Sequence, residues 1–507
     1  MTHVMPERSN RTGPLHDLAR AVHATPDRPL LLWKDGAMTV SEFADAVRSA
    51  ALELQDYGVG AGDRVAIMAA NSHRVLILTY AIWTVHGVEV AVNAELKGPL
   101  LRHVLDDSDP VLLFSDTVHA PVVHEQRPDL AQRDLNNVRL ERTTDERFEL
   151  VGESTLASLL YTSGTTGPSK GVMIPHGYYS YFASILGSVV HLTPEDTCYF
   201  TLPFFHVDAH IALPAALQCG SRLAFVQRFS VSAFWSDVTD FGATWFGAVG
   251  SMLSALITRG RPTQEALKRL RLILAAPVPD EAFTFFEDGL GVTVLEMYGQ
   301  TEANGPLYST LDRRKRGAVG WPCAGFDVQV VDDEHHPVAT GQIGELLTRS
   351  TQPDSRALGY WRRPDATAET MHAGWFRTGD LVRQDEDGFV WYAGRKTDSL
   401  RHRGENISAF ELESVLRAAP DVRTAAAIAV RDELGGEDQI KAVLVVEDTF
   451  DLSAFLTYCR ASLPRFSIPR YVELVDEEQI VRGPGTGSIQ KHQLPQGITA
   501  ATVDTRP

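Results

Sequence analysis

The sequence predicts an α/β fold: a large N-terminal unit of parallel sheets covered by helices on both faces, a barrel-like segment, and a small α+β module. Between residues 60 and 300, short apolar runs alternate with helix-length segments, which is typical of parallel sheets buried on both faces. After about residue 315, short runs are separated by turns rich in Gly, Asp and Pro, which favours antiparallel strands. A helix–strand–strand–helix–strand pattern begins near residue 398.

The expected elements follow in chain order. The strands of the first region are Arg64–Met68, Val111–Phe114, Leu156–Thr162, Cys198–Leu202, Arg222–Val226, Ala243–Ala248, Leu270–Ala275 and Val292–Tyr298, and its crossover helices are His176–Ser188, Val207–Gln218, Ser230–Asp240 and Asp280–Asp288. The barrel-like segment holds strands Asp327–Val331, Gly344–Thr348 and Gly388–Ala393. The last module reads Ala409–Ala418, Thr424–Val430, Ala442–Val446, Leu452–Ser462 and Tyr471–Val475. We interpret the polar stretch His124–Glu153 as a surface excursion.

Composition narrows the class of protein. A chain of 507 residues with a net charge of −18 and a pI near 5.4 is not expected to bind nucleic acid or an anionic membrane. The four cysteines form no C-x-x-C pair, so we expect reduced thiols and a cytoplasmic location. The polar start, Met1–Thr12, does not resemble a signal peptide, and no apolar stretch is long enough to span a membrane.

The strongest local motif is the loop Tyr161-Thr-Ser-Gly-Thr-Thr-Gly-Pro-Ser-Lys170, which follows an apolar strand. Glycines, hydroxyl side chains and a terminal lysine make a loop that can surround phosphate oxygens. It is not a Walker loop, because Ser169 stands where the second glycine would be. The alternative interpretation is a Gly/Ser/Thr linker, which seldom carries a lysine directly after a buried strand.

Other polar segments follow predicted strands, namely Phe204-Phe205-His206, Ala275-Ala276-Pro277 and Tyr298-Gly-Gln-Thr-Glu302. Because ligands bind at the carboxyl ends of parallel strands, these segments are expected to converge on one crevice, although each alone could be a turn. Glu302 offers a hard oxygen ligand for Mg²⁺. Asp380 either binds two ribose hydroxyls or caps a turn, and the Arg395 guanidinium could bond ribose or phosphate.

These motifs, in order from about residue 30 to 492, resemble the ANL superfamily of adenylate-forming enzymes. The segments Pro203–Asp208 and Arg401–Ser408 are most similar to carnitine/crotonobetaine-type CoA ligases. The resemblance implies an N-terminal adenylate-binding domain (1–396), a mobile C-terminal lid (397–507) and two half-reactions. In the first, a carboxylate attacks ATP and gives acyl-AMP and pyrophosphate. In the second, the thiol of CoA displaces AMP.

The resemblance also implies roles for individual residues. Phosphates would be held by Thr162, Ser163, Gly164, Thr165, Thr166, Gly167 and Lys170, the α-phosphate by Thr301, and Mg²⁺ by Glu302 and Thr166. Adenine would be framed by Ala275, Ala276, Pro277, Met297, Tyr298, Gly299 and Gln300, and ribose held by Asp380 and Arg395. The acyl pocket would comprise His206, Trp245, Gly247, Ala248 and Gly250, and the CoA loop Gly404, Glu405 and Asn406. His206 would be an aromatic gate near the acyl carboxylate, with a purely structural histidine as the alternative.

Two positions depart from the family pattern. The hinge position, usually Asp or Lys, is Thr397, a mild change because hinges accept many residue types. The C-terminal motif Gly-Lys-Ile reads Gly487-Ser488-Ile489, so Ser488 replaces the lysine that bridges carboxylate and α-phosphate. Loss of such an electrostatic donor costs on the order of 10²–10³ in rate. Lys491 could substitute for it, and an engineered serine is the other alternative.

The sequence therefore predicts an acyl-CoA ligase-like enzyme that favours the thioester half-reaction, with a separate adenylating enzyme supplying acyl-AMP. The first alternative is a complete ATP-dependent ligase for a bulky hydrophobic acid, suggested by the small residues of Trp245–Gly250. The second is a module that loads a carrier protein in trans, or a protein that only binds acyl-adenylates. Whether the chain forms a homodimer is left open.

Overall fold

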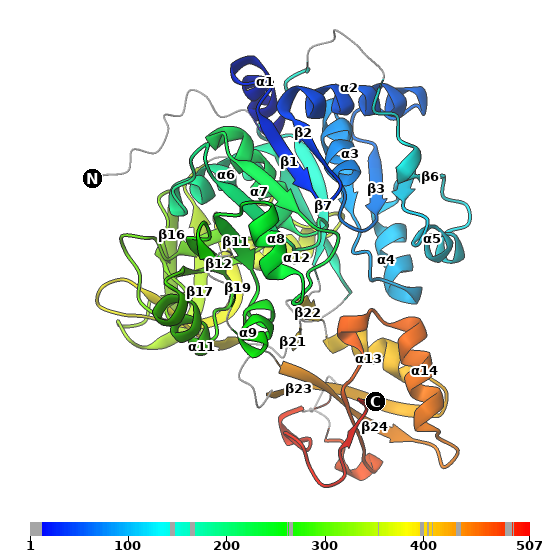
Figure 1. Cartoon of the computed structure of the whole chain (residues 1–507). Coiled ribbons are helices and arrows are strands. Elements are labelled where there is room, and N and C mark those ends of the chain that lie inside the picture. Colours follow the sequence, from blue (N-terminus) through cyan, green and yellow to red (C-terminus); the bar gives the residue numbers. More distant parts are fainter. Residues whose placement is uncertain are drawn as a thin grey trace.

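The computed structural model describes residues 13–141, 148–162, 168–260, 262, 267–352, 354–395, 400–402, 405–407, 409–431, 438–481, 489 and 491–506. A large N-terminal α/β domain lies above a smaller C-terminal α+β domain in the view of Figure 1. This confirms the predicted fold class. The predicted boundary and its hinge, Thr397, lie outside the described residues, so the division at 396/397 stays a prediction.

One sheet of the large domain has six strands in the order β6-β5-β3-β4-β7-β8. The strands are β3 (Arg64–Met68), β4 (Val88–Ala91), β5 (Leu112–Ser115), β6 (Gln132–Asp134), β7 (Leu156–Thr162) and β8 (Lys170–Pro175). All neighbours are parallel except β7 and β8, which form a hairpin around the predicted phosphate loop. The hairpin fixes the two ends of that loop, Thr162 and Lys170, opposite each other in register.

The second sheet has nine strands in the order β15-β14-β13-β12-β11-β9-β10-β1-β2. They are β1 (Pro29–Trp33), β2 (Gly36–Thr39), β9 (Thr197–Phe200), β10 (Arg222–Phe225), β11 (Trp245–Ala248), β12 (Leu272–Ala275), β13 (Thr293–Gln300), β14 (Asn304–Tyr308) and β15 (Trp321–Pro322). The six strands from β13 to β1 are parallel, and the edge strands β2, β14 and β15 are antiparallel. The sheets are thus parallel in their centres and antiparallel at one or both edges.

Helices between the two sheets form the largest core. They are α1 (Pro14–Ala24), α2 (Val40–Asp56), α3 (His73–Thr84), α6 (His176–Val189) and α7 (Val207–Cys219), and one continuous apolar cluster joins them to both sheets. Nearly every residue of α6 is buried, as expected for a helix that is apolar on all sides. The turn before α7 carries His206, so the burial of this helix fixes where that residue lies.

Shorter helices cover the outer faces of the sheets. The nine-stranded sheet is covered by α8 (Phe234–Asp240), α9 (Gly250–Arg259), α11 (Asp280–Ala282) and a π-helical turn, η3 (Phe283–Asp288). The six-stranded sheet is covered by α4 (Gly98–Ser108) and α5 (Ala120–Gln126). In the described chain, no helix combines the length and the apolar composition that a membrane crossing requires.

The barrel-like segment is a five-stranded antiparallel sheet of β16 (Phe326–Val331), β17 (Ile343–Ser350), β18 (Met371–His372), β19 (Trp375–Gln384) and β20 (Val390–Arg395), with α12 (Pro364–Thr370) beside it. The small domain contains β21 (Leu400–His402), β22 (Glu405–Ile407), α13 (Ala409–Arg417), β23 (Val422–Arg431), β24 (Asp438–Val446), α14 (Leu452–Ser462), β25 (Tyr471–Leu474) and β26 (Val503–Asp504). Short 3₁₀ turns lie at Leu135–Asn137, Arg465–Ser467, Glu477–Gln479 and Lys491–Gln493.

Two expectations about elements were wrong. The helix expected over Ser230–Asp240 begins only at Phe234, because Ser230 and Ser232 bond to each other and Ser230 caps the turn at Ala233. The stretch His124–Glu153 is more than a surface excursion, because β6 pairs with β5 and extends the six-stranded sheet. A polar strand at a sheet edge lacks the apolar run by which the buried strands were found.

Candidate active site

Glu302 lies where the two sheets of the large domain face each other. Its Oε1 accepts hydrogen bonds from Thr162 Oγ1 at 2.9 Å and from the Tyr360 hydroxyl at 3.1 Å. The ammonium of Lys170 lies 5.2 Å from the centre of the Tyr360 ring. Thr162 and Lys170 from the predicted phosphate loop therefore lie close to Glu302 from a second motif, and Tyr360 contacts both Glu302 and Lys170.

Several predicted residues lie outside the described residues. These are Ser163, Gly164, Thr165, Thr166 and Gly167 of the phosphate loop, Gly404 of the CoA loop, and Ser488. For Arg395 and Asn406 the strand is described but the side chain is not. The assignments of all these residues stay predictions.

Asp380, on β19 of the five-stranded sheet, is held by donors from β13 of the nine-stranded sheet. The Tyr298 hydroxyl and Gln300 Nε2 each donate to Asp380 Oδ2 at 2.5 Å, and the carboxylate is 3% exposed. The amide of Asp380 donates to Thr378 Oγ1 at 3.1 Å. Strand register places Asp380 directly opposite Arg395, so the two predicted ribose residues are neighbours.

The predicted adenine-binding residues lie at the carboxyl ends of β12 and β13. Gly250 approaches Pro277 so closely that a Cβ on it would be 2.9 Å from the Pro277 carbonyl oxygen. The amide of Val278 donates to Glu296 Oε1 at 3.2 Å, which ties the loop containing Ala276 and Pro277 to β13. Burial raises the pKa of Glu296 to about 7.

The end of β13 turns sharply into β14. A Cβ on Gly299 would lie 2.7 Å from the Asn304 carbonyl oxygen, so only glycine fits there. The carbonyl of Thr301 accepts a hydrogen bond from the Tyr178 hydroxyl at 3.0 Å, which anchors this turn to α6. Met297 is half-buried on the side of the central core.

The residues predicted for the acyl pocket follow β11. Trp245, 3% exposed, packs in the central core at the amino end of the strand. Gly247 is partly exposed, and a Cβ on it would be 3.8 Å from the Trp245 ring. Ala248 and Gly250 lie at the carboxyl end, next to the Pro277 loop. The arrangement leaves small residues at the end of the strand that faces the candidate site.

His206 forms a direct link between the two domains. Its Nε2 donates to Glu405 Oε1 on β22 at 2.9 Å. Burial lowers the pKa of His206, but the Glu405 carboxylate, its hydrogen bond and Asp208 outweigh burial, so the pKa is raised overall. A residue predicted as an acyl gate and one predicted in the CoA loop are thus in contact.

Two further contacts hold the small domain against the large one. The amide of Ser169, next to the phosphate loop, donates to Glu411 on α13 of the small domain. Within the large domain, the Ser169 carbonyl lies 2.8 Å from His103 Nε2 on α4. The first residue of α4, Gly98, lies against the carbonyl of Ser462 at the end of α14. The lid is therefore docked on three separate elements.

Lys491 lies within the small domain. Its ammonium forms an ion pair with Glu413 Oε1 on α13 at 2.8 Å, and the same oxygen accepts the amide of Ala427 at 2.8 Å. The Lys491 side chain is 16% exposed. Its positive charge is therefore neutralised inside the lid in this arrangement.

Mg²⁺ in proteins commonly takes one or two carboxylates together with substrate phosphates and water. Glu302 suits this role, because hydroxyl groups orient its carboxylate at the phosphate-loop end of β7. The described part of the chain contains no cluster of three or more His, Cys, Asp or Glu side chains that could hold a metal by itself. Glu302 would thus supply one ligand to a nucleotide-bound ion.

Sequence reasoning missed residues that act through distant contacts. Tyr360, Glu411 and Glu413 lie in no motif that we could recognise, and only the fold brings them to Glu302, Ser169 and Lys491. A signal did exist for Glu89 and His210. Glu89 interrupts an apolar strand, and His210 follows His206 by four residues, a spacing at which residues meet along a helix.

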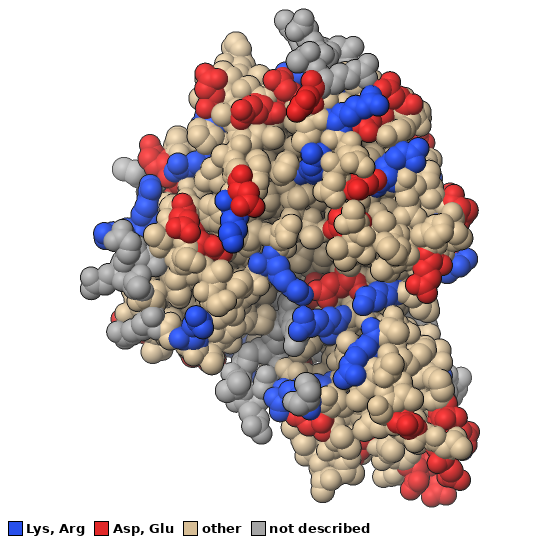
Figure 2. Space-filling model, turned by 45° about the vertical axis from the view of Figure 1, so that its right-hand side comes forward, with Lys and Arg blue, Asp and Glu red and all other residues tan. Residues whose placement is uncertain are grey.

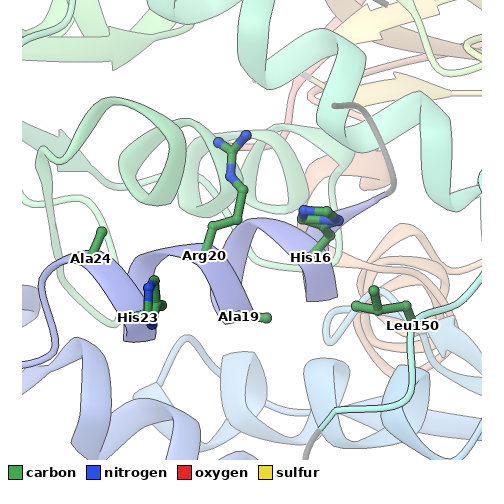
Figure 3. A pocket seen from close by; sticks show the side chains of 6 residues that line it. All are labelled: His16, Ala19, Arg20, His23, Ala24 and Leu150. Atoms are coloured by element: carbon green, nitrogen blue, oxygen red, sulfur yellow. The ribbon is translucent and has the colours of Figure 1, made fainter. Parts of the chain in front are cut away.

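A surface hollow of about 490 Å³ lies along α1 (Figure 3). In Figure 1, α1 lies at the end of the large domain opposite the lid. This hollow contains none of the predicted site residues; its lining is His16, Ala19, Arg20, His23, Ala24 and Leu150. We assign it no part in the candidate active site.

The chain belongs to the AMP-binding enzyme family, whose model matches residues 18–361, while the model of the AMP-binding enzyme C-terminal domain matches residues 411–482. Together with its relatives this makes the chain an acyl-CoA ligase of the ANL superfamily, as the motifs predicted. Sulfoacetate–CoA ligase of Cupriavidus necator is 30% identical over 92% of this chain and 94% of its own length. Crotonobetaine/carnitine–CoA ligase of Salmonella agona is 26% identical over 82% of this chain and 86% of its own length.

Among solved structures, o-succinylbenzoate CoA synthetase from Bacillus subtilis is 25% identical. Its double mutant bound with the product analogue OSB-NCoA superposes with a TM-score of 0.85 over 94% of this chain and 98% of that one. The same synthetase in complex with AMP superposes with a TM-score of 0.70 over 95% of this chain and 98% of that one. The two domains of this chain are thus arranged more like those of the product-analogue complex.

Proposed function

We propose that this acyl-CoA ligase acts mainly in the thioester half-reaction and that Ser488 weakens its adenylation half-reaction. The sulfur of CoA attacks the acyl carbonyl of acyl-AMP, the carbonyl–phosphate C–O bond breaks, and AMP leaves with that oxygen. The thiol proton passes to solvent. A separate adenylating enzyme would supply the acyl-adenylate.

The contact between His206 and Glu405 is the observation that carries this proposal. It joins the predicted acyl gate to the predicted CoA loop across the domain interface, at 2.9 Å. The higher similarity to the product-analogue complex than to the AMP complex supports the same arrangement. A lid held this way brings Glu405 of the predicted CoA loop next to the predicted acyl gate, as transfer of the acyl group to a thiol would require.

The position of Lys491 supports the second part of the proposal. Adenylation brings together two anions, the acyl carboxylate and the triphosphate, and a cation offsets their repulsion as charge develops. Lys491 would have to leave Glu413, and the buried carboxylate of Glu413 would then lack its counter-charge. Its use as a substitute for the missing lysine therefore carries an electrostatic cost.

The described residues have distinct tasks in this mechanism. Asp380, oriented by Tyr298 and Gln300, would hold the ribose of the adenylate. Lys170 would lie near its phosphate, and Mg²⁺ at Glu302 would neutralise phosphate charge if ATP is used. Figure 2 shows Lys and Arg side chains gathered where the lid meets the large domain, which suits a ligand with several phosphates such as CoA.

The second candidate is a complete two-step CoA ligase. It is favoured by the relatives, which are named as CoA ligases, and by Thr162, Lys170 and Glu302, which lie together as ATP binding requires. The acids named for the relatives are small and polar, so the predicted preference for a bulky apolar acid needs a direct comparison.

The test assays acyl transfer alone. Synthetic adenylates of sulfoacetate, crotonobetaine, acetate and a bicyclic aromatic acid are each mixed with CoA, and release of AMP is followed. We expect AMP release with at least one adenylate and a higher kcat/KM with CoA than with a holo carrier protein. No CoA-dependent AMP release from any of them would overturn the proposal. A higher kcat/KM for acetyl-adenylate than for the aromatic adenylate would contradict only the predicted preference for a bulky acid and would leave the proposed half-reaction untouched.

A further inference from the structure

A buried acid–histidine pair lies directly behind the gate residue. His210 Nε2 on α7 is 2.8 Å from Glu89 Oε2 on β4, and the two side chains are 4% and 2% exposed. The hydroxyls of Thr79 and Ser158 also donate to Glu89, at 2.6 and 2.8 Å. No step of the proposed mechanism uses this pair, yet burial of two ionisable groups is costly unless they are paired.

The second ring nitrogen of His210 points to the gate. His210 Nδ1 lies 3.1 Å from the main-chain carbonyl oxygen of His206. A carbonyl oxygen only accepts, and a carboxylate with two other donors is held in its accepting form, so both ring nitrogens donate. His210 is therefore an imidazolium that connects Glu89 to the backbone of His206.

The electrostatics agree with this geometry. Burial lowers the pKa of His210, but Glu89, its hydrogen bond, the His206 carbonyl and Asp208 together raise it overall. Burial raises the pKa of Glu89, but His210 and the two hydroxyls lower it overall. The ring of Tyr179 on α6 stacks on His210, with 5.2 Å between centroids and 19° between planes, which fixes the plane of the imidazolium.

We propose that the Glu89–His210 pair is a positioning device for the thioester half-reaction: it holds the main chain of His206 so that its ring meets Glu405 when the lid docks. The inference rests on the proposed function, because docking through Glu405 matters only if the thioester step uses it. His206 begins α7 as its N-cap residue, with no side-chain capping bond of its own. Its amide donates to the Pro203 carbonyl at 3.1 Å and its ring lies 4.6 Å from the Phe205 ring, and His210 and Glu405 add contacts to its carbonyl and its ring.

The variant that tests the proposal is the double substitution Glu89→Gln with His210→Phe. Phenylalanine keeps the stack on Tyr179. Glutamine keeps an acceptor oxygen for one of the hydroxyls of Thr79 and Ser158, and its amide group can donate to the other. One positive and one negative charge disappear together, so their direct effects on the pKa of His206 largely cancel. Neither a lone buried charge nor a cavity is left behind.

Asp17→Asn is the matched control. Asp17 is also a buried carboxylate that bridges α6 and α7, where it accepts hydrogen bonds from Ser180 and Gln218 at 2.7 and 2.9 Å. It has no bond to His206. Asp17→Asn removes a buried negative charge and keeps an acceptor oxygen for both donors, so acyl transfer from acyl-AMP to CoA should stay within about twofold of the unmodified chain.

Three measurements are made on the full chain: single-turnover acyl transfer, AMP binding by calorimetry, and titration of His206 by NMR with ¹³C-labelled histidine. For the double variant we expect at least a tenfold slower transfer, AMP affinity within about twofold, and a lower pKa of His206. Adding Glu405→Gln should then have little further effect, since the contact is already lost. In the unmodified background Glu405→Gln alone should slow transfer.

A fall in melting temperature with unchanged transfer and an unchanged His206 pKa would overturn the inference, because the pair would then only stabilise the fold. The inference would also be overturned if the double variant and Glu405→Gln slowed acyl transfer independently, so that the combined variant showed the product of their two fold-losses. If the unmodified chain transfers no acyl group, the proposed function fails instead. The His206 titration then still decides whether the pair positions the gate against Glu405.

Discussion

Replacing Asp380 by alanine tests the nucleotide site through contacts that the structure defines. The carboxylate accepts hydrogen bonds from Tyr298 and Gln300, both at 2.5 Å, and the proposed site adds the ribose hydroxyls of the adenylate. Hydrogen bonds to a charged group contribute about 1.5–3 kcal/mol. Loss of the ribose contact should therefore weaken AMP binding roughly 10- to 100-fold, because about 1.4 kcal/mol corresponds to a factor of ten.

The same substitution removes an acceptor from the Tyr298 hydroxyl and one of the acceptors of Gln300 Nε2, so the melting temperature should also fall. Asp385→Ala separates the two effects. Asp385 is a carboxylate of the same segment that bonds to Lys315 and Trp391, and these bonds lower its pKa to about 2 against the effect of burial. Calorimetric titration with AMP should show a loss for Asp380→Ala only. AMP affinity that is unchanged in a folded Asp380→Ala variant would refute the ribose assignment.

Three further predictions concern the lid. Gly404→Leu should slow acyl transfer to CoA at least tenfold while AMP binding stays unchanged, because a side chain there would obstruct the thiol arm. Equal losses of acyl transfer and of AMP binding, together with a lower melting temperature, would indicate misfolding instead. Glu405 raises the pKa of His206, so their ion pair is complete below the ordinary pKa of histidine and is lost as pH rises through the raised value. The rate of acyl transfer by the unmodified chain, divided by the rate of Glu405→Gln, should therefore decline with rising pH. A ratio that does not change with pH would contradict this. Lys491→Met should lower the melting temperature, because Glu413 then lacks its counter-charge. The rate of acyl transfer should stay within about twofold of the unmodified chain. A tenfold loss of this rate in stopped-flow assays would contradict the prediction.

Local sequence patterns predicted the strands and helices that build the centre of the site. The apolar run before Tyr161 and the run Val292–Tyr298 become β7 and β13, whose ends carry Thr162 and Gln300. Periodicity located them because each is buried and flanked by turns. The strands β1, β4 and β6 were not predicted. Glu89 interrupts β4 and β6 is polar throughout, whereas β1 is as short and apolar as strands that were predicted.

The contacts that complete the site could not be predicted in the same way. Thr162 meets Glu302 across 140 residues of chain, and His206 meets Glu405 across 199. Such pairings depend on how two sheets and a second domain pack, which no local pattern encodes. The ion pair of Lys491 with Glu413 is another example, because the sequence suggested only that Lys491 could substitute for the missing lysine and gave no sign of Glu413.

The central claim concerns Ser488, and exchange of pyrophosphate with ATP tests it most directly. The assay is run with the acid whose adenylate supports acyl transfer, on the unmodified chain, Ser488→Lys and Lys491→Ala. We predict very slow exchange in the unmodified chain and a gain of up to about 10²-fold for Ser488→Lys, since a cation is restored where charge develops. Acyl transfer from synthetic acyl-AMP should remain within about twofold. Rapid exchange in the unmodified chain that Lys491→Ala abolishes would contradict the account and identify an ordinary two-step ligase.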